Sequence, residues 1–396
     1  MITVEEANQI ISDRSGDFGV ESISLEDSMG RVLRAPIKAD RDMPPYDRVT
    51  MDGIAIRYTD YANGCRSYPI KGVAAAGAEK MHLSDHNACL EVMTGAIMPE
   101  GLDTVIQYEH LEIVDGVATI NEPVNDQQNV HFKGLDRKAG EVVIEAGKAI
   151  GSPEIGVCAT VGKDRLEVSR LPKTIIISSG DELVEIDEAP LPHQIRKSNV
   201  YRLKTVLKHY HIEADMAHLL DDYETIVEKL RGYLSAYDLV ILSGGVSKGK
   251  FDFLPKALEA LGVEKHFHKI AQRPGKPFWF GSKDNATVFA FPGNPVSSFM
   301  CMQQYFKPWL DQSLQLNAEP VPKAVLGSDV QFKPDLTYFL EVKLEYSETG
   351  HLIANPVKGN GSGDLANLVD ADAFIVLPRG REQFLQGEVH PVIFYR

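Results

Sequence analysis

Residues 238–249 read Asp238-Leu239-Val240-Ile241-Leu242-Ser243-Gly244-Gly245-Val246-Ser247-Lys248-Gly249. The apolar, β-branched run is typical of a buried strand in a parallel sheet. The loop after it holds three glycines and two serines, whose backbone N–H groups can close on an anion. Apolar residues then recur at helical spacing from Leu254 to Leu261, so the loop leads into a helix N-terminus, which also favours negative charge. A plain tight connection explains the loop alone equally well, since it is neither a P-loop nor a GxGxxG loop.

Strands and helices alternate around this loop. Residues 174–178 form an apolar run, 200–211 and 223–236 have amphipathic helical periodicity, and the 238–242 strand follows. This alternation predicts a doubly wound parallel sheet over residues 173–312, with ligands at the carboxyl ends of the strands.

The pattern of apolar and polar residues differs in two other regions of the chain. Residues 41–136 carry short β-like runs with glycine turns, and Pro320-Val321-Pro322 precedes a region that alternates apolar and polar residues. We predict a multidomain α/β plus β fold with a central three-layer α/β/α domain. The predicted domains are a mixed domain I at 1–40 and 137–172, a β-rich inserted domain II at 41–136, an α/β/α domain III at 173–312, and a small β-barrel or sandwich, domain IV, at 318–396.

Composition excludes several classes of function. The 396 residues are 43% hydrophobic and 24% charged with a net charge of −15, which argues against broad nucleic-acid binding. No run approaches the roughly 18 apolar residues of a membrane helix, and we expect no signal peptide. The four cysteines lie far apart without CxxC spacing, as expected for reduced thiols in a cytoplasmic protein. Positive charge concentrates in one place, residues 265–276.

Several acidic residues occupy turn positions, namely Asp47, Asp52, Asp136, Asp181, Glu182, Asp221, Asp222 and Asp252. Taken singly, each is more often a turn former, and Asp221 or Asp252 could cap a helix. Acids at the carboxyl end of a strand are also where an α/β enzyme places Mg²⁺ with oxygen ligands.

Two further segments point to anion chemistry. Arg273-Pro274-Gly275-Lys276-Pro277 holds two cations in a proline-bounded turn. The stretch from Phe291 to Ser298 follows a strand and opens a helix, as a second potential anion cradle. Two cradles, two fixed cations and several acids in one α/β unit favour phosphate or oxyanion chemistry.

These motifs carry a family resemblance. The chain resembles the molybdopterin molybdenumtransferase family (MoeA and gephyrin E-domain type) in three motifs. In chain order, these are Ser243-Gly244-Gly245-Val246-Ser247, Pro274-Gly275-Lys276-Pro277 and Pro292-Gly293-Asn294-Pro295-Val296-Ser297. The resemblance covers essentially the whole chain, including Met51-Asp52-Gly53, Thr94–Gly101, Gly180–Leu183, Ser198-Asn199 and Gly361-Ser362-Gly363. It implies Mg²⁺-dependent insertion of molybdate into adenylated molybdopterin with release of AMP. It also implies a homodimer whose site is shared across the interface, and a molybdopterin adenylyltransferase as a possible partner.

The resemblance also assigns roles to residues. The implied catalytic acids are Asp52, Asp136, Glu182, Asp221 and Asp252, and Glu182, Asp221 and Asp252 are the implied metal ligands. The implied substrate-binding residues are Thr94, Gly95, Ser243, Gly244, Gly245, Ser247, Gly249, Lys269, Pro292, Gly293, Asn294 and Pro295. The implied molybdate-binding residues are Arg273, Lys276, Pro277, Ser297 and Ser362.

The chain departs from the family pattern at Arg48-Val49, at Lys248 and at Glu341, where the family usually has an arginine. These departures keep two rival functions open: a cofactor-binding scaffold without turnover, and a nucleotide pyrophosphatase on the same α/β domain. The choice between molybdate and tungstate also stays open.

Overall fold

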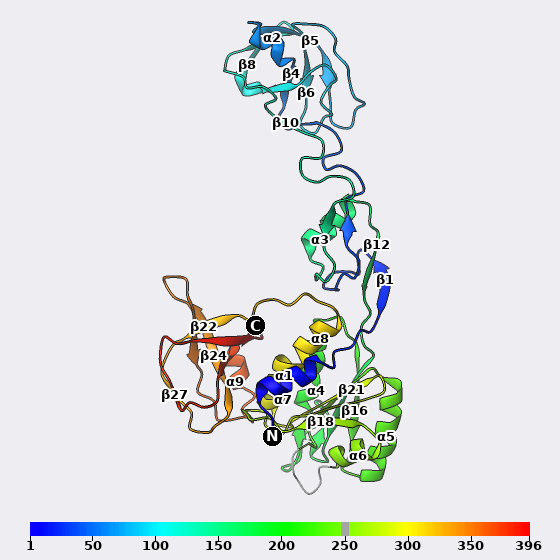
Figure 1. Ribbon diagram of the computed structural model, residues 1–396, viewed down its shortest axis with the longest axis vertical. Helices are drawn as coiled ribbons and strands as arrows, with labels where there is room; N and C mark the ends of the chain where they lie inside the picture. The colour runs from blue at the N-terminus through cyan, green and yellow to red at the C-terminus, as the bar shows by residue number, and fades with distance from the viewer. Residues whose placement is uncertain (247–252) are drawn as a thin grey trace. The chain divides into compact units, whose positions relative to one another are not determined.

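The computed structural model describes residues 1–246 and 253–396 (Figure 1). The described residues form two compact units. Unit 1 contains Met1–Arg34, Gly147–Gly151 and Leu166–Arg396, and unit 2 contains Ala35–Ala146 and Ser152–Arg165. The finer division into four domains stays a prediction.

The central sheet of unit 1 runs in the order β16-β13-β17-β21-β20-β18. Its strands are β13 (Thr174–Ser179), β16 (Ala214–Leu219), β17 (Leu239–Ser243), β18 (Glu264–His268), β20 (Trp279–Lys283) and β21 (Ala286–Phe291). From β16 to β21 the neighbours pair in parallel, as predicted. The β20 and β18 edge is antiparallel instead, because only Asp284 and Asn285 connect β20 to β21, which is too short for a crossover helix.

Helices cover both faces of this sheet. Alternate strand residues point to opposite faces, so Ile176 and Ile241 pack with α4 (Ser198–Lys208) and the run α7 (Pro295–Cys301), η2 (Met302–Phe306) and α8 (Lys307–Ser313). Ile177 and Val240 pack on the other face with α5 (Tyr223–Ala236) and α6 (Leu254–Ala260). The three-layer α/β/α prediction is therefore confirmed.

The C-terminal part of unit 1 closes into a barrel. It contains β19 (Gln272–Arg273), β22 (Lys323–Leu326), β24 (Thr337–Tyr346), β25 (Leu352–Pro356), β26 (Ala373–Leu377), β28 (Val389–Phe394), the pair β23 (Val330–Gln331) and β27 (Gln383–Phe384), and α9 (Asn367–Asp370). The strand order is β19-β24-β25-β22-β28-β26, and β26 also pairs with β24, which closes the ring. Because β19 joins β24 in parallel, Arg273 is positioned beside Tyr338 at the barrel's edge.

The remaining elements of unit 1 are α1 (Val4–Ser12), β1 (Val20–Ser24), β12 (Arg165–Ser169), β14 (Leu183–Val184) and β15 (Ile195–Arg196). Helix α1 begins at a capping box, in which Thr3 and Glu6 each accept the other's backbone N–H. Among the described residues, no helix has the length and apolar character needed to span a membrane.

Unit 2 is β-rich, as predicted for residues 41–136, which make up most of it. Its main sheet runs in the order β7-β4-β6-β5-β9-β8, with β10-β3 and β11-β2 as separate pairs. Its elements are β2 (Ile37–Lys38), β3 (Arg48–Val49), β4 (Gly53–Ile56), α2 (Tyr58–Ala62), β5 (Ser67–Ala74), β6 (Cys89–Val92), β7 (Thr104–Gln107), η1 (Tyr108–His110), β8 (Leu111–Val114), β9 (Val117–Ile120), β10 (Val130–His131), β11 (Val142–Ile144) and α3 (Ser152–Thr160).

Candidate functional site

Two glycine-containing loops lie side by side at the carboxyl edge of the central sheet. Strands β17 and β21 are parallel neighbours, and Ser243 at the end of one is paired with Phe291 at the end of the other. The backbone N–H of Gly244 donates to the carbonyl oxygen of Phe291 over 3.1 Å, which joins the starts of the two loops. Gly244 has φ +96°, and a Cβ there would lie 2.9 Å from the carbonyl oxygen of Ser179. Glycine is therefore required at this position.

Asn199 on α4 holds the two loops together. Its Nδ2 donates to Oγ of Ser243 over 3.1 Å and to the carbonyl oxygen of Gly293 over 2.7 Å. In the sequence, Asn199 belongs to the family motif Ser198-Asn199 but has no predicted role. Its position near the start of a predicted helix could have marked it as a polar group close to the loops, but the sequence did not reveal that it contacts both of them.

The loops border a cavity of about 580 Å³, which we call the glycine-loop cavity. Nine of the predicted site residues line it, namely Glu182, Ser243, Gly244, Gly245, Pro277, Pro292, Gly293, Asn294 and Pro295. Glycine, serine and proline make up about half of the lining residues, and such small side chains suit a phosphate group that must approach the backbone closely.

A second cavity of about 350 Å³, which we call the cationic-turn cavity, lies between the α/β/α part and the barrel. All of the predicted molybdate-binding residues line it, namely Arg273, Lys276, Pro277, Ser297 and Ser362. Pro277, Pro292 and Asn294 line both cavities, so the two adjoin along one wall. Asn294 Nδ2 also donates to Ser362 Oγ over 2.8 Å, which links the second loop to the barrel.

The cationic turn rests on a buried glutamine. Gln272 is fully buried, its Nε2 donates to the carbonyl oxygen of Gly275 over 3.1 Å, and its Oε1 accepts from the Tyr305 hydroxyl. A Cβ on Gly275, which has φ +84°, would lie 2.7 Å from Sγ of Cys301. The buried side of the turn is therefore fixed by Gln272 and by packing against Cys301, whereas Arg273 and Lys276 are exposed.

Glu341 lies in the same cavity as the two cations. Burial raises the pKa of the Glu341 carboxyl above its ordinary value, the negative charge of Asp364 raises it further, and the positive charge of Arg273 opposes the shift. The carboxylate therefore opposes an anion in this cavity when it is ionised.

The acids after β13 and β16 have separate roles. Asp222 is the N-cap of α5 and accepts from the backbone N–H of Thr225, so the capping alternative for Asp221 is wrong. Asp221 instead accepts from Oγ of Ser179 over 3.4 Å, and its backbone N–H donates to Asp181. Within the described ranges, no group of three or more His, Cys, Asp and Glu side chains is placed to hold a metal ion.

Some predicted residues do not join this site in unit 1. Ser247, Gly249 and Asp252 lie outside the described residues. Lys269 has φ +85° and its backbone bonds to Ile2 and Phe278, but it is absent from the described linings of both cavities.

The other predicted site residues, Asp52, Thr94, Gly95 and Asp136, belong to unit 2. Asp52 accepts from the backbone N–H of Thr94 over 2.6 Å and from its hydroxyl over 2.8 Å, and these bonds lower the pKa of the Asp52 carboxyl. Asp136 contacts Nε2 of His131 at 2.9 Å, and Nδ1 of His131 lies 3.2 Å from Arg48. Gly95 follows Thr94 with φ +88°, and its backbone N–H donates to Val49.

Comparisons with known proteins cover the whole chain. Family profiles match residues 2–162 (MoeA N-terminal region, domain I and II), 175–312 (probable molybdopterin binding domain) and 323–395 (MoeA C-terminal region, domain IV). A molybdopterin molybdenumtransferase of Synechocystis is 39% identical over 99% of both chains, and one of Staphylococcus epidermidis is 31% identical over 99% of this chain and 95% of its own. A crystal structure of a molybdopterin biosynthesis MoeA protein from Pyrococcus horikoshii superposes with a TM-score of 0.84 and 28% identity, covering 100% of this chain and 99% of its own.

Proposed function

This chain belongs to the MoeA family of molybdopterin molybdenumtransferases, and from this membership we propose that it inserts molybdate into adenylated molybdopterin with release of AMP. As an enzyme of molybdenum cofactor biosynthesis it would act on a small pterin substrate. We also propose that it is cytoplasmic and receives its substrate from a molybdopterin adenylyltransferase.

The observation that carries the proposal is the pair of adjoining cavities. One is lined by the glycine loops and the other by a turn with two cations, and they share Pro277, Pro292 and Asn294. A reaction that joins a phosphate-bearing pterin to an oxyanion needs two such places in contact. This arrangement supports insertion over hydrolysis of a nucleotide alone.

The chain's own groups supply binding and positioning. The N–H groups of the glycine loops hold the phosphates, while Arg273 offers a planar fork and Lys276 a compact charge to the dianionic molybdate. A water oxygen attacks the adenylate phosphorus and the bond to the pterin phosphate breaks, which releases AMP. If a molybdate oxygen attacks first, the same bond breaks to give adenylyl molybdate, which water then hydrolyses to AMP and molybdate. Catalysis comes mainly from positioning and electrostatic stabilisation.

The donors also fit a Mg²⁺ ion. Glu182 follows β13 and Asp221 follows β16, so both carboxylates come from loops at the carboxyl edge of the sheet that the glycine loops share. Mg²⁺ commonly binds one or two carboxylates together with substrate phosphates. We propose that Glu182 and Asp221, with Asp252, hold this ion, which when bound neutralises phosphate charge.

A reconstitution assay tests this function. We expect the purified protein, supplied with adenylated molybdopterin, Mg²⁺ and molybdate, to release AMP and to bind molybdenum in step with it. Tungstate in place of molybdate measures oxyanion preference. Release of AMP that ignores the oxyanion would support the pyrophosphatase, and binding without release would support the scaffold.

A second prediction concerns assembly. Asp52 and Asp136 belong to unit 2, whereas the glycine loops belong to unit 1, and we propose a homodimer in which residues of both subunits complete each site. Mixing inactive Asp52→Ala protein with inactive Asp221→Ala protein should then restore up to about a quarter of the sites in a random mixture. Mixing each variant with itself is the control. If subunit exchange is demonstrated and no activity returns, each site lies within one chain.

A third prediction concerns pH. Because the pKa of Glu341 is raised, its neutral form persists to a higher pH than in an ordinary glutamate. Below this pKa the cationic-turn cavity carries one negative charge fewer, so molybdate should bind more tightly, and affinity should fall as pH rises through it. Calorimetric titration of molybdate from about pH 5 to about pH 8 measures this dependence.

Two variants test the assignment to Glu341. Glu341→Gln should keep the tight binding across this range and flatten the pH dependence, and Glu341→Arg should bind molybdate more tightly still. Glu345→Gln, on the same strand β24 but outside the cavity lining, is the matched control. An unchanged pH profile in Glu341→Gln would place the responsible group elsewhere.

A further inference from the structure

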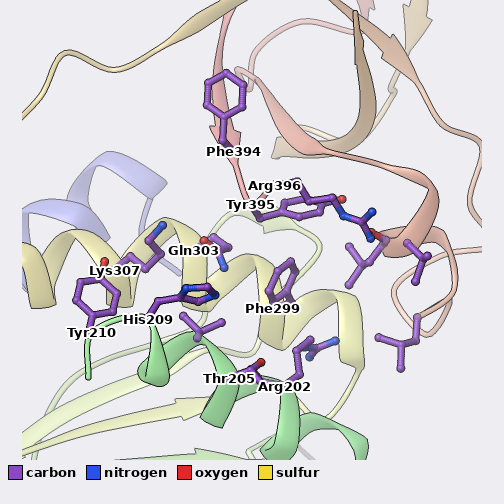
Figure 2. Close-up of a pocket in the computed structure, with 14 residues that line it drawn as sticks. Arg202, Thr205, His209, Tyr210, Phe299, Gln303, Lys307, Phe394, Tyr395 and Arg396 are labelled. Atoms are coloured by element: carbon purple, nitrogen blue, oxygen red, sulfur yellow. The ribbon is translucent and has the colours of Figure 1, made fainter. Parts of the chain in front are cut away.

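A third cavity of about 880 Å³ lies between helix α4, the helical run α7–η2–α8 and the end of the barrel. Figure 2 shows Arg202 and Thr205 from α4, and His209 at the C-cap of this helix, on one side of it. Gln303 and Lys307 face them from the neighbouring helix, and Phe394, Tyr395 and Arg396 close it from the C-terminal end of the chain. The volume is in the range of small-molecule sites, and none of the cavities discussed above includes these residues. We call it the α4 cavity.

The α4 cavity is strongly cationic. Arg202, Lys307 and Arg396 line it, with His209 beside them, and none of the described lining residues is Asp or Glu. Acids act on the cavity from outside its lining. Asp311 is hydrogen-bonded to Tyr210 and interacts with Lys307, Asp372 interacts with Arg396, and both Glu341 and Asp372 interact with Tyr395. Such a wall attracts an anion.

Arg202 is the most unusual of these cations because it is largely buried without a carboxylate. Its Nη2 donates only to uncharged oxygens, those of Asn199, Pro295 and Ser298, at 3.2, 2.7 and 2.8 Å. Burial lowers its pKa to about 10, so it stays charged at neutral pH. A buried charge normally requires an opposite charge or a full set of hydrogen bonds.

Three polar groups of this lining have buried atoms without hydrogen-bond partners within the described structure. These atoms are Nε of Arg202, Oε1 of Gln303 and Oη of Tyr395. The Gln303 residue is only 6% exposed and lines the cavity. Buried polar atoms are nearly always paired. These three have almost no accessible surface, so they leave the cavity wall short of hydrogen bonds without themselves contacting a ligand.

The apolar part of the lining limits the ligand's shape. The rings of Phe299 and Tyr395 pack edge to face with centroids 5.1 Å apart, and the Arg202 guanidinium lies 5.0 Å from the Phe299 ring centroid. Aromatic faces and edges of this kind pack well against a flat ring. Leu365 lines both this cavity and the glycine-loop cavity, so the two adjoin there, but the α4 cavity has no glycine loop to cradle a phosphate chain.

We propose that the α4 cavity is a second ligand site, which binds a small aromatic anion with its ring against Phe299 and Tyr395 and its anionic group towards one of the cations on its two sides, Lys307 or Arg396. The anionic group is a carboxylate or a phosphate monoester. This site is independent of the proposed transferase reaction, because its cations and rings take no part in holding molybdate or the adenylated pterin.

Calorimetry on the full-length protein tests the site with three probes of one ring system. We expect 2-naphthoate or 2-naphthyl phosphate to bind saturably at one molecule per chain, and the stronger of the two identifies the anionic group. Neutral 2-naphthol should bind at least about 10-fold more weakly, because a hydrogen bond to a charged group is lost. Molybdate and inorganic phosphate should not displace the probe.

Variants locate the binding. One of the two variants Lys307→Ala and Arg396→Ala should weaken binding of the anionic probe about 10-fold, which identifies the cation that holds the anionic group. Thr205→Trp should block it by filling the cavity without changing its charge. Lys208→Ala is the matched control, because Lys208 is an exposed cation on α4 that does not line the cavity. Thermal melting checks that every variant is folded.

Three outcomes would overturn the proposal. One is equal affinity for 2-naphthol, which would leave only a hydrophobic crevice. Another is binding that none of the cavity variants changes. The third is no saturable binding to the wild-type chain at millimolar probe, which would mean that a second copy of the chain or another segment covers this face.

Discussion

Asp221→Ala is expected to lower turnover by about 100-fold or more while the protein stays folded. Asp221 follows β16 at the carboxyl edge of the central sheet, and its carboxylate accepts from Ser179 at the end of β13. It is not the cap of α5, so its removal leaves that helix intact. If it helps to hold Mg²⁺ against the substrate phosphates, the loss falls on the chemical step. Turnover in the reconstitution assay and thermal melting, measured together, check this.

Asp222→Ala is the matched control, because it removes the same charge from the adjacent residue. Asp222 accepts from the backbone N–H of Thr225 and caps α5. This variant should melt at a lower temperature and retain near-normal turnover. A reversed pair of results, with activity lost in Asp222→Ala and kept in Asp221→Ala, would contradict the role proposed for Asp221.

Lys276→Ala is expected to raise the molybdate concentration needed for half-maximal turnover by about 10- to 100-fold, the usual cost of losing a hydrogen bond to a charged group. Gln272 fixes the turn that carries Lys276, so little backbone freedom is lost when the side chain binds an anion. Binding of the adenylated pterin should change little, because the glycine loops remain. Titration of turnover with each substrate in turn separates the two effects.

Lys265→Ala makes the same change of charge at an exposed position in the same basic segment, and Lys265 lines neither cavity. It should leave both titrations unchanged. Equal losses in Lys265→Ala and Lys276→Ala would mean that general positive charge attracts the oxyanion, and an unchanged titration in Lys276→Ala would remove the cationic turn from the molybdate site.

The sequence contained the local part of this architecture. The capping box at Thr3 and Glu6, the buried runs of β13 and β17 and the glycines that need positive φ depend on residues close together in the chain. Family motifs added the candidate residues, and the five predicted molybdate-binding residues line one cavity. Their roles stay predictions, and Ser247, Gly249 and Asp252 lie outside the described residues.

The sequence by itself located the strands and helices around the glycine loop to within about three residues, because periodicity and capping act within a few residues of each other. The helix predicted at 200–211, for example, is Ser198–Lys208. Only the tertiary structure decided what meets across long separations. Asn199 bridges loops that begin more than 40 residues later in the chain, and Glu341 of the barrel lies in the cavity of Arg273. The α4 cavity has the same origin. Contacts of this kind depend on how whole elements pack, which no local pattern of residues records.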